Sequence, residues 1–132
     1  MHQIIKEYID STSRLSSILE KYADKGQFFE KTFCNLVTVI NIEEVDHQVY
    51  LEVDQAIING HSDPNLYSLF ISYAISLYSR RNKLERANAI QSIGLSLPRE
   101  KIHPVIFSFF ILKMADIKFY EGKTVEYNAL LK

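Results

Sequence analysis

The sequence predicts an all-α fold, an array of antiparallel helical hairpins with about seven helices. Apolar residues recur every three or four positions along most of the chain, as one face of a helix requires. Four glycines and three prolines in 132 residues are too few for a turn-rich β protein. Apolar residues make up 47% and charged residues 23%, which is typical of a globular chain. The length is that of one domain, residues 1–132.

The first helical pattern covers residues 2 to about 25, and Gly26 follows it where a C-terminal glycine belongs. The polar cluster Asp10–Ser13 interrupts the apolar face, so two shorter helices are an alternative. A second pattern begins at Gln27. Its segment Leu36–Ile42 is rich in β-branched residues and is also compatible with a strand. We favour a helix, because no partner strand with clean alternation is evident.

The third helix is predicted to begin near Glu43 and Glu44, since acidic residues suit a first helical turn, and to end at Gly60. The fourth begins at Asp63 and Pro64. The Asp63 carboxylate can accept an unpaired backbone N–H, and proline at the first position has no N–H to leave unpaired. This fourth helix is apolar nearly all round, which is typical of a central core helix or of an interface.

Three further helices complete the prediction. One begins near Leu84 and is stopped by Pro98, the next runs from Pro104 towards Gly122, and the last begins near Thr124. Because this last helix ends abruptly at Lys132, the chain is either a fragment of a longer protein or docks that face on its own body.

The sequence pattern of the fourth helix is partly repeated about forty residues later. The segment Ser68–Ile71 matches Ser108–Ile111 at a shift of 40, while Ala74 and Tyr78 match Ala115 and Phe119 at a shift of 41. In each copy a polar turn and a second helix follow. Alanine at 74, 115 and 87 offers the small residue that close helix packing requires.

This pattern resembles the tetratricopeptide repeat superfamily over about residues 64–132. The repeat has a small residue in its first helix and a turn about seven residues later, a spacing that Ala115 and Gly122 share. The period differs from the repeat's length of about 34 residues, and no tryptophan is present. A further helix–glycine–helix junction at Leu19–Phe29 would bring the number of hairpins to three. The alternative is an unrelated helical bundle.

Composition excludes several classes of protein. A formal net charge of −1 argues against nucleic-acid binding by bulk electrostatics. No apolar run is long enough to span a membrane, and the N-terminus lacks the pattern of a signal peptide. The single Cys34 excludes an internal disulfide and cysteine-clustered metal sites. These features predict a cytoplasmic protein without a membrane partner.

Candidate chemical motifs have simpler explanations. His47 lies one helical turn from Glu43, but Leu51 occupies the position where a second metal ligand would be needed. The run His61-Ser62-Asp63 cannot adopt the geometry of a catalytic triad, and Ser62 and Asp63 suit a helix cap. No glycine-rich phosphate loop is present. We therefore predict no catalytic residue, no metal site and no cofactor.

Aromatic and basic residues indicate a surface for a partner. Tyrosine suits a surface that a partner partly buries, and the only dense basic cluster follows the fourth helix, where cations also favour a helix C-terminus. The predicted partner-binding residues are Tyr67, Tyr73, Arg80, Arg81, Arg86 and Tyr120.

These features favour a non-catalytic module that binds a protein, a peptide or a partner helix. For tetratricopeptide-like domains of bacterial type, the resemblance implies two contexts. One is the effector or sensor domain of a transcription regulator, and the other is a small secretion chaperone. A homo-oligomer is compatible with the same features. The alternatives are a nucleic-acid-associated protein that uses the Arg80–Arg86 turn, although direct contact is disfavoured by charge, and a small helical enzyme.

Overall fold

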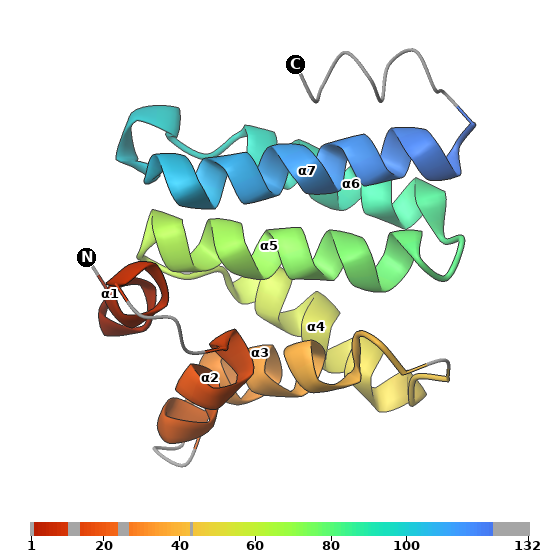
Figure 1. The fold of residues 1–132 in the computed structure, drawn as a ribbon. Coiled ribbons are helices and arrows are strands. Elements are labelled where there is room, and N and C mark those ends of the chain that lie inside the picture. Colours follow the sequence, from red (N-terminus) through yellow and green to blue (C-terminus); the bar gives the residue numbers. More distant parts are fainter. Residues whose placement is uncertain (1, 11–13, 24–26, 43, 123–132) are drawn as a thin grey trace.

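The computed structural model describes residues 2–10, 14–23, 27–42 and 44–122 (Figure 1). In these residues the secondary structure is helical and no strand occurs, which confirms the all-α class. The elements are α1 (Gln3–Asp10), α2 (Leu15–Ala23), α3 (Phe28–Val39), α4 (His47–Asn59), α5 (Pro64–Ser79), α6 (Leu84–Leu95), a short 3₁₀ turn η1 (Arg99–Lys101) and α7 (Pro104–Tyr120).

The N-terminal segment is divided at the polar cluster that the sequence marks. Helix α1 ends at Asp10 and α2 begins at Leu15, so the alternative of two short helices is confirmed. Serine, threonine and aspartate side chains compete for backbone hydrogen bonds and therefore favour such breaks. Gly26, the predicted end of the segment, lies outside the described residues.

Helix α3 includes the β-branched stretch that was also compatible with a strand. It remains helical to Val39 and buries Phe33 and Leu36 completely. The start of α4 was predicted too early. Asp46 caps this helix, because its carboxylate accepts a hydrogen bond from the Gln48 N–H at 2.8 Å. Gly60 ends α4 with φ +68°, as expected of a terminal glycine.

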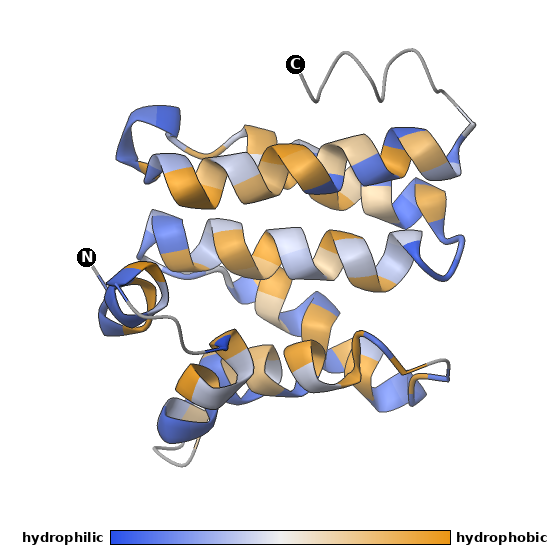
Figure 2. Ribbon diagram, in the orientation of Figure 1, coloured by the Kyte–Doolittle hydropathy of each residue, from blue (hydrophilic) through white to orange (hydrophobic). Residues whose placement is uncertain are grey.

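Helix α5 is the centre of the molecule. Asp63 accepts a hydrogen bond from the Leu66 N–H at 2.9 Å and Pro64 is the first helical residue, so the predicted cap is confirmed. Every residue of α5 except Pro64 and Tyr73 is buried. Figure 1 shows α6 and α7 on one side of α5 and the first four helices on the other. In Figure 2, hydrophobic segments of α5 alternate with paler ones of intermediate hydropathy, and burial on nearly all sides agrees with the central position of this helix.

The C-terminal three helices pack closely. The chain turns between α5 and α6 at Asn82, which has φ +59° and so takes the place of the glycine missing from this turn. Helix α6 returns in the opposite direction to α5 (Figure 1). At Gly94, an added Cβ would lie 2.3 Å from the Phe110 ring of α7 and 3.1 Å from Ile71 of α5. The predicted small residues Ala74, Ala87 and Ala115 are all fully buried.

Helix α7 begins and ends where the sequence indicates. The His103 Nδ1 atom accepts a hydrogen bond from the Val105 N–H at 3.1 Å, and Gly122 follows the helix with φ +79°. The predicted last helix from Thr124 lies outside the described residues. Among the helices of the described part, none has both the length and the apolar character needed to cross a membrane.

Candidate functional site

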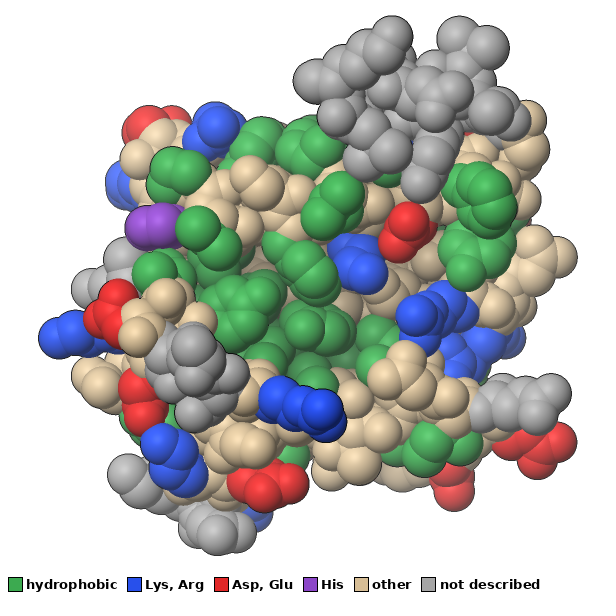
Figure 3. All heavy atoms as spheres, in the orientation of Figure 1, with side chains coloured by type: hydrophobic (Ala, Val, Ile, Leu, Met, Phe, Trp, Pro, Cys, Tyr) green, Lys and Arg blue, Asp and Glu red, His purple; other side chains and the backbone are tan. Residues whose placement is uncertain are grey.

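A hollow of about 580 Å³ lies where the N-terminal helices meet α5. We call it the Tyr73 hollow. Side chains of α1, α2, α3 and α5 line it together with the residue before α2 and two residues that follow α3: Tyr8, Arg14, Leu15, Ser16, Glu20, Val37, Thr38, Ile40, Asn41 and Tyr73. Figure 3 shows hydrophobic side chains gathered over the middle of this face of the molecule, with charged side chains around them. An apolar floor with a polar rim is the usual anatomy of a protein-binding surface.

Tyr73 is central to this hollow. Its ring centroid lies 5.9 Å from that of Phe33 in α3 and 5.1 Å from that of Phe109 in α7, so the aromatic surface continues from the hollow towards α7. Burial, with a smaller contribution from Tyr8, raises the pKa of Tyr73 to about 12. The hydroxyl is therefore neutral at physiological pH and can donate a hydrogen bond to a ligand.

The rim of the aromatic surface carries both signs of charge. Exposed Arg14 and Glu20 line the hollow itself. Towards α7, the Lys113 ammonium lies 4.9 Å from the centre of the Phe109 ring and 3.6 Å from the Asp116 carboxylate. A mixed rim does not select a ligand of one charge, so apolar contact would provide most of the binding.

Arg80 and Arg81 bind the C-terminal end of α3. Arg80 donates hydrogen bonds to the Asn41 side chain and, at 3.5 Å, to the Ile40 carbonyl. Arg81 donates to the carbonyls of Ile40, at 3.3 Å, and Ile42. The last carbonyls of a helix have no partner within it, and cations favour that end electrostatically. Arg81 also donates to the Leu77 carbonyl at 3.1 Å, at the C-terminal end of α5 where the sequence places the cations. Both arginines in addition join α5 to the end of α3, a contact that the sequence did not suggest.

Arg86 belongs to a third set of contacts. Its guanidinium donates to the Asp54 carboxylate at 3.0 Å, and the Tyr78 hydroxyl donates to the same oxygen at 2.7 Å. Burial and the hydrogen bond that the Tyr78 hydroxyl donates to Asp54 raise the pKa of Tyr78. Of the basic cluster, Lys83 extends over the Tyr50 ring at 5.1 Å and lines a neighbouring depression of about 800 Å³. The cluster is thus divided among separate contacts, and the nucleic-acid alternative gains no support from it.

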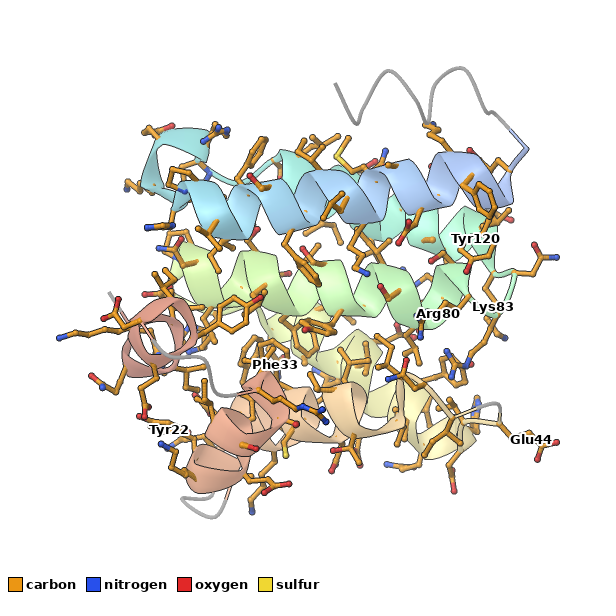
Figure 4. The ribbon with its side chains drawn as sticks, viewed as in Figure 1. Tyr22, Phe33, Glu44, Arg80, Lys83 and Tyr120 are labelled. Atoms are coloured by element: carbon orange, nitrogen blue, oxygen red, sulfur yellow. The ribbon has the colours of Figure 1, made fainter. Side chains whose placement is uncertain are left out.

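The two remaining predicted residues, Tyr67 and Tyr120, have different surroundings. Tyr67 is only 7% exposed, and its hydroxyl donates to the Ile57 carbonyl at 2.7 Å, so it belongs to the core and is not part of the candidate surface. Tyr120 is exposed at the end of α7, at the same end of the molecule as Arg80 and Lys83 (Figure 4). Of the six predicted residues, only Tyr73 lines the hollow.

A second cluster was not found from the sequence. His2 lies just before α1, Glu30 in the first turn of α3, and His61 between α4 and α5. The Glu30 Oε1 atom lies 4.0 Å from His2 Nε2 and 3.8 Å from His61 Nε2. One potential metal-binding atom from each of the three residues lies within 4.8 Å of the others. Because each residue comes from a different segment, no local spacing in the sequence could indicate the cluster.

Backbone hydrogen bonds orient both imidazole rings. The Nδ1 atom of His2 accepts from the Ile4 N–H at 3.1 Å, and that of His61 accepts from the Asp63 N–H at 3.0 Å. Each Nε2 atom therefore faces Glu30, and in a neutral ring it carries the proton. Burial lowers the pKa of His61, and the Glu30 carboxylate opposes this effect. The His2 backbone N–H also donates to the Asp63 carboxylate at 3.1 Å, which ties the N-terminus to the start of α5.

Comparison with known proteins identifies no relative. No protein-family model matches the chain, and searches of curated proteins and of solved structures give no significant match.

Proposed function

We propose that the chain is a non-catalytic protein-interaction module whose Tyr73 hollow receives an apolar segment of a partner protein. The observation that carries this proposal is the partly exposed Tyr73 on an otherwise buried helix, in a hollow that four helices line. Tyrosine provides a large rigid apolar surface with one polar atom, and such residues are enriched at the centres of interfaces. Stacked helices present surfaces of this kind to peptides and partner helices.

The wider context of this module remains the one that the tetratricopeptide-like pattern implies. We propose either the effector or sensor domain of a bacterial regulator or a small chaperone of secretion. In both contexts we propose that the partner protein contributes an apolar segment that would otherwise be exposed to water. A hollow with an aromatic floor suits such a segment, because burial of apolar area is the main source of its affinity.

Site-specific photo-cross-linking in cells tests the proposal. A photoreactive phenylalanine analogue replaces Thr38, which is exposed and lines the hollow. The matched control carries the analogue at Ile58, an apolar α4 residue that is 75% exposed and lies outside the hollow. We expect one protein to be cross-linked from position 38 and not from position 58.

A competing substitution makes this test specific. In the background of the position-38 analogue, Tyr73→Glu should abolish the cross-linked product while the far-ultraviolet circular dichroism spectrum stays that of a folded helical protein. If Tyr73→Glu unfolds the chain, Asn41→Glu at the exposed rim takes its place. Equal cross-linking from positions 38 and 58, or a product that survives both substitutions, would contradict the proposed site. A cross-linked product made only of two copies of this chain would contradict a foreign partner and would show that the hollow mediates self-association.

A further inference from the structure

We propose that His2, Glu30 and His61 form a binding site for a divalent transition-metal ion, and that zinc suits it best. Two imidazoles and one carboxylate are a frequent zinc-ligand set, in which a fourth position is left for water or a further ligand. This inference is independent of the Tyr73 hollow and goes beyond the proposed interaction function.

The distances fit a metal centre after a small contraction. Ligand atoms about 2.0–2.2 Å from a tetrahedral zinc ion lie about 3.3–3.6 Å from one another. The observed separations between Glu30 Oε1 and the two imidazole nitrogens are 3.8 and 4.0 Å. One ligand atom from each of the three residues lies within 4.8 Å of the others, so side-chain movements of about 1 Å would bring the three together around one ion.

Glu30 provides a second and independent observation. The residue is only 9% exposed, and in the described part of the structure its Oε2 atom is buried without a hydrogen-bond partner. A buried carboxylate is costly unless a cation or hydrogen-bond donors compensate its charge. The imidazole nitrogens near Oε1 lie beyond hydrogen-bond distance, so they compensate it incompletely. A metal ion bound by both oxygens of the Glu30 carboxylate would supply the partner that Oε2 lacks.

The orientation of the imidazole rings limits the affinity. Zinc requires the lone pair of Nε2, so the ring proton must move to Nδ1, where it conflicts with the backbone N–H donors from Ile4 and Asp63. Most zinc-binding histidines instead donate from the second nitrogen to an acceptor, and loss of such a partner weakens metal binding about 10–100-fold. We therefore expect weaker binding than in a site with this second shell, and a steep loss of affinity as the pH falls and the imidazoles bind protons.

Metal binding would connect three segments of the chain. His2 precedes α1, Glu30 lies on α3 and His61 precedes α5, so one ion would connect the start of α1 to α3 and to the start of α5. It would do so at the start of the helix that carries Tyr8. Zinc should therefore stabilise the folded chain by an amount that rises with the logarithm of its concentration above the Kd, as does any ligand that binds only the folded state.

The test uses the full chain without an affinity tag, in a thiol-free reducing buffer, with zinc chloride as the only ligand. Isothermal titration calorimetry at pH 7.5 should show one equivalent of zinc bound. The midpoint of thermal unfolding should rise with zinc. At pH 5.5 both effects should be lost.

Substitutions assign the binding to the cluster. Glu30→Gln and His61→Asn should each weaken zinc binding at least tenfold. Asparagine at position 61 can still accept from the Asp63 N–H, so the start of α5 is preserved. The matched control is His103→Asn, because His103 accepts from a backbone N–H in the same way at α7 and lies outside the cluster. It should leave the affinity unchanged.

Two results would overturn the proposal. The first is the absence of both heat and thermal stabilisation when zinc is added to the folded wild-type chain. The second is unchanged affinity in Glu30→Gln and in His61→Asn, which would place the metal at the N-terminal amine or at Cys34. If Glu30→Gln does not fold, His61→Asn alone decides between the cluster and these other sites.

Discussion

Helices α5 and α7 share one sequence pattern but differ in their surroundings. Both begin with a polar cap followed by proline, and Ser68–Ile71 of α5 is echoed by Ser108–Ile111 of α7. Helix α5 is buried on nearly all sides because it lies between α6–α7 and the N-terminal helices. Helix α7 lies at the edge, where Val105 and Leu112 are 49% and 48% exposed.

This difference shows what a helical repeat pattern determines. The periodicity and the caps specify that each segment is a helix and where it begins. Burial of its second face depends on whether another layer of the chain lies against that face, and this is a property of the whole fold. In α5 the N-terminal helices provide that layer, and beyond its first residue Pro64 only Tyr73 remains partly exposed there.

The largest effect predicted from this comparison concerns two equivalent isoleucines. Ile71 is fully buried in α5, whereas its counterpart Ile111 in α7 is partly exposed. Ile71→Ala should destabilise the fold by about 2–5 kcal/mol, since it removes apolar contacts and leaves a cavity. Ile111→Ala should cost about 1–2 kcal/mol less, because water can fill the space that it leaves. Urea unfolding followed by circular dichroism measures both values, and the change in helix propensity is the same in each. Equal losses would show that the two positions are equally enclosed.

A smaller effect is expected at the contact between the two helices. The Cβ of Gly94→Ala would overlap the buried Phe110 ring of α7, and Ile71 of α5 closes the other side. Overpacking typically costs about 1–3 kcal/mol, and the better helix propensity of alanine returns up to about 1 kcal/mol. The net loss of unfolding free energy should be about 1–2 kcal/mol. Ser92→Ala, at an exposed position of α6, is the control and should change the stability by less than about 0.5 kcal/mol.

Much of the fold follows from local sequence. The helical periodicity, the Asp63-Pro64 start of α5 and the glycine at the end of α4 were predicted because each depends on neighbouring residues, and the polar break after α1 was recognised as an alternative on the same grounds. The start of α4 was wrong, since acidic residues at 43 and 44 suit a first turn while Asp46 provides the actual cap. The close packing at Gly94 could not be predicted from local sequence, because it involves residues from two other helices.

The candidate site was less predictable for the same reason. Tyr73 was named from its aromatic character, but the sequence could not separate it from Tyr67, whose ring faces the core. Arg80 and Arg81 were identified as one basic cluster, and their use at the end of α3 depends on a contact between distant segments. The cluster of His2, Glu30 and His61 joins positions about thirty residues apart along the chain. No spacing rule for metal ligands on one helix or loop would detect it.

The smallest predicted effect on stability at neutral pH is that of the Tyr73 hydroxyl, a group that Lys113 at the equivalent position of α7 lacks. Burial raises the pKa of Tyr73 to about 12 in the folded chain. The unfolded chain ionises this hydroxyl at its ordinary pKa of about 10, and therefore at a lower pH than the folded chain does. The stabilising contribution is thus complete below pH 10 and is lost as the pH rises from about 10 to 12. Tyr73→Phe should leave the stability at pH 7 nearly unchanged and reduce the loss of stability between pH 10 and 12. Guanidinium unfolding at several pH values measures this loss, and absorbance at 295 nm follows tyrosine ionisation. Tyr120→Phe, at an exposed position, is the control. If both variants lose stability as the wild type does, Tyr73 is solvated and the floor of the hollow is not apolar.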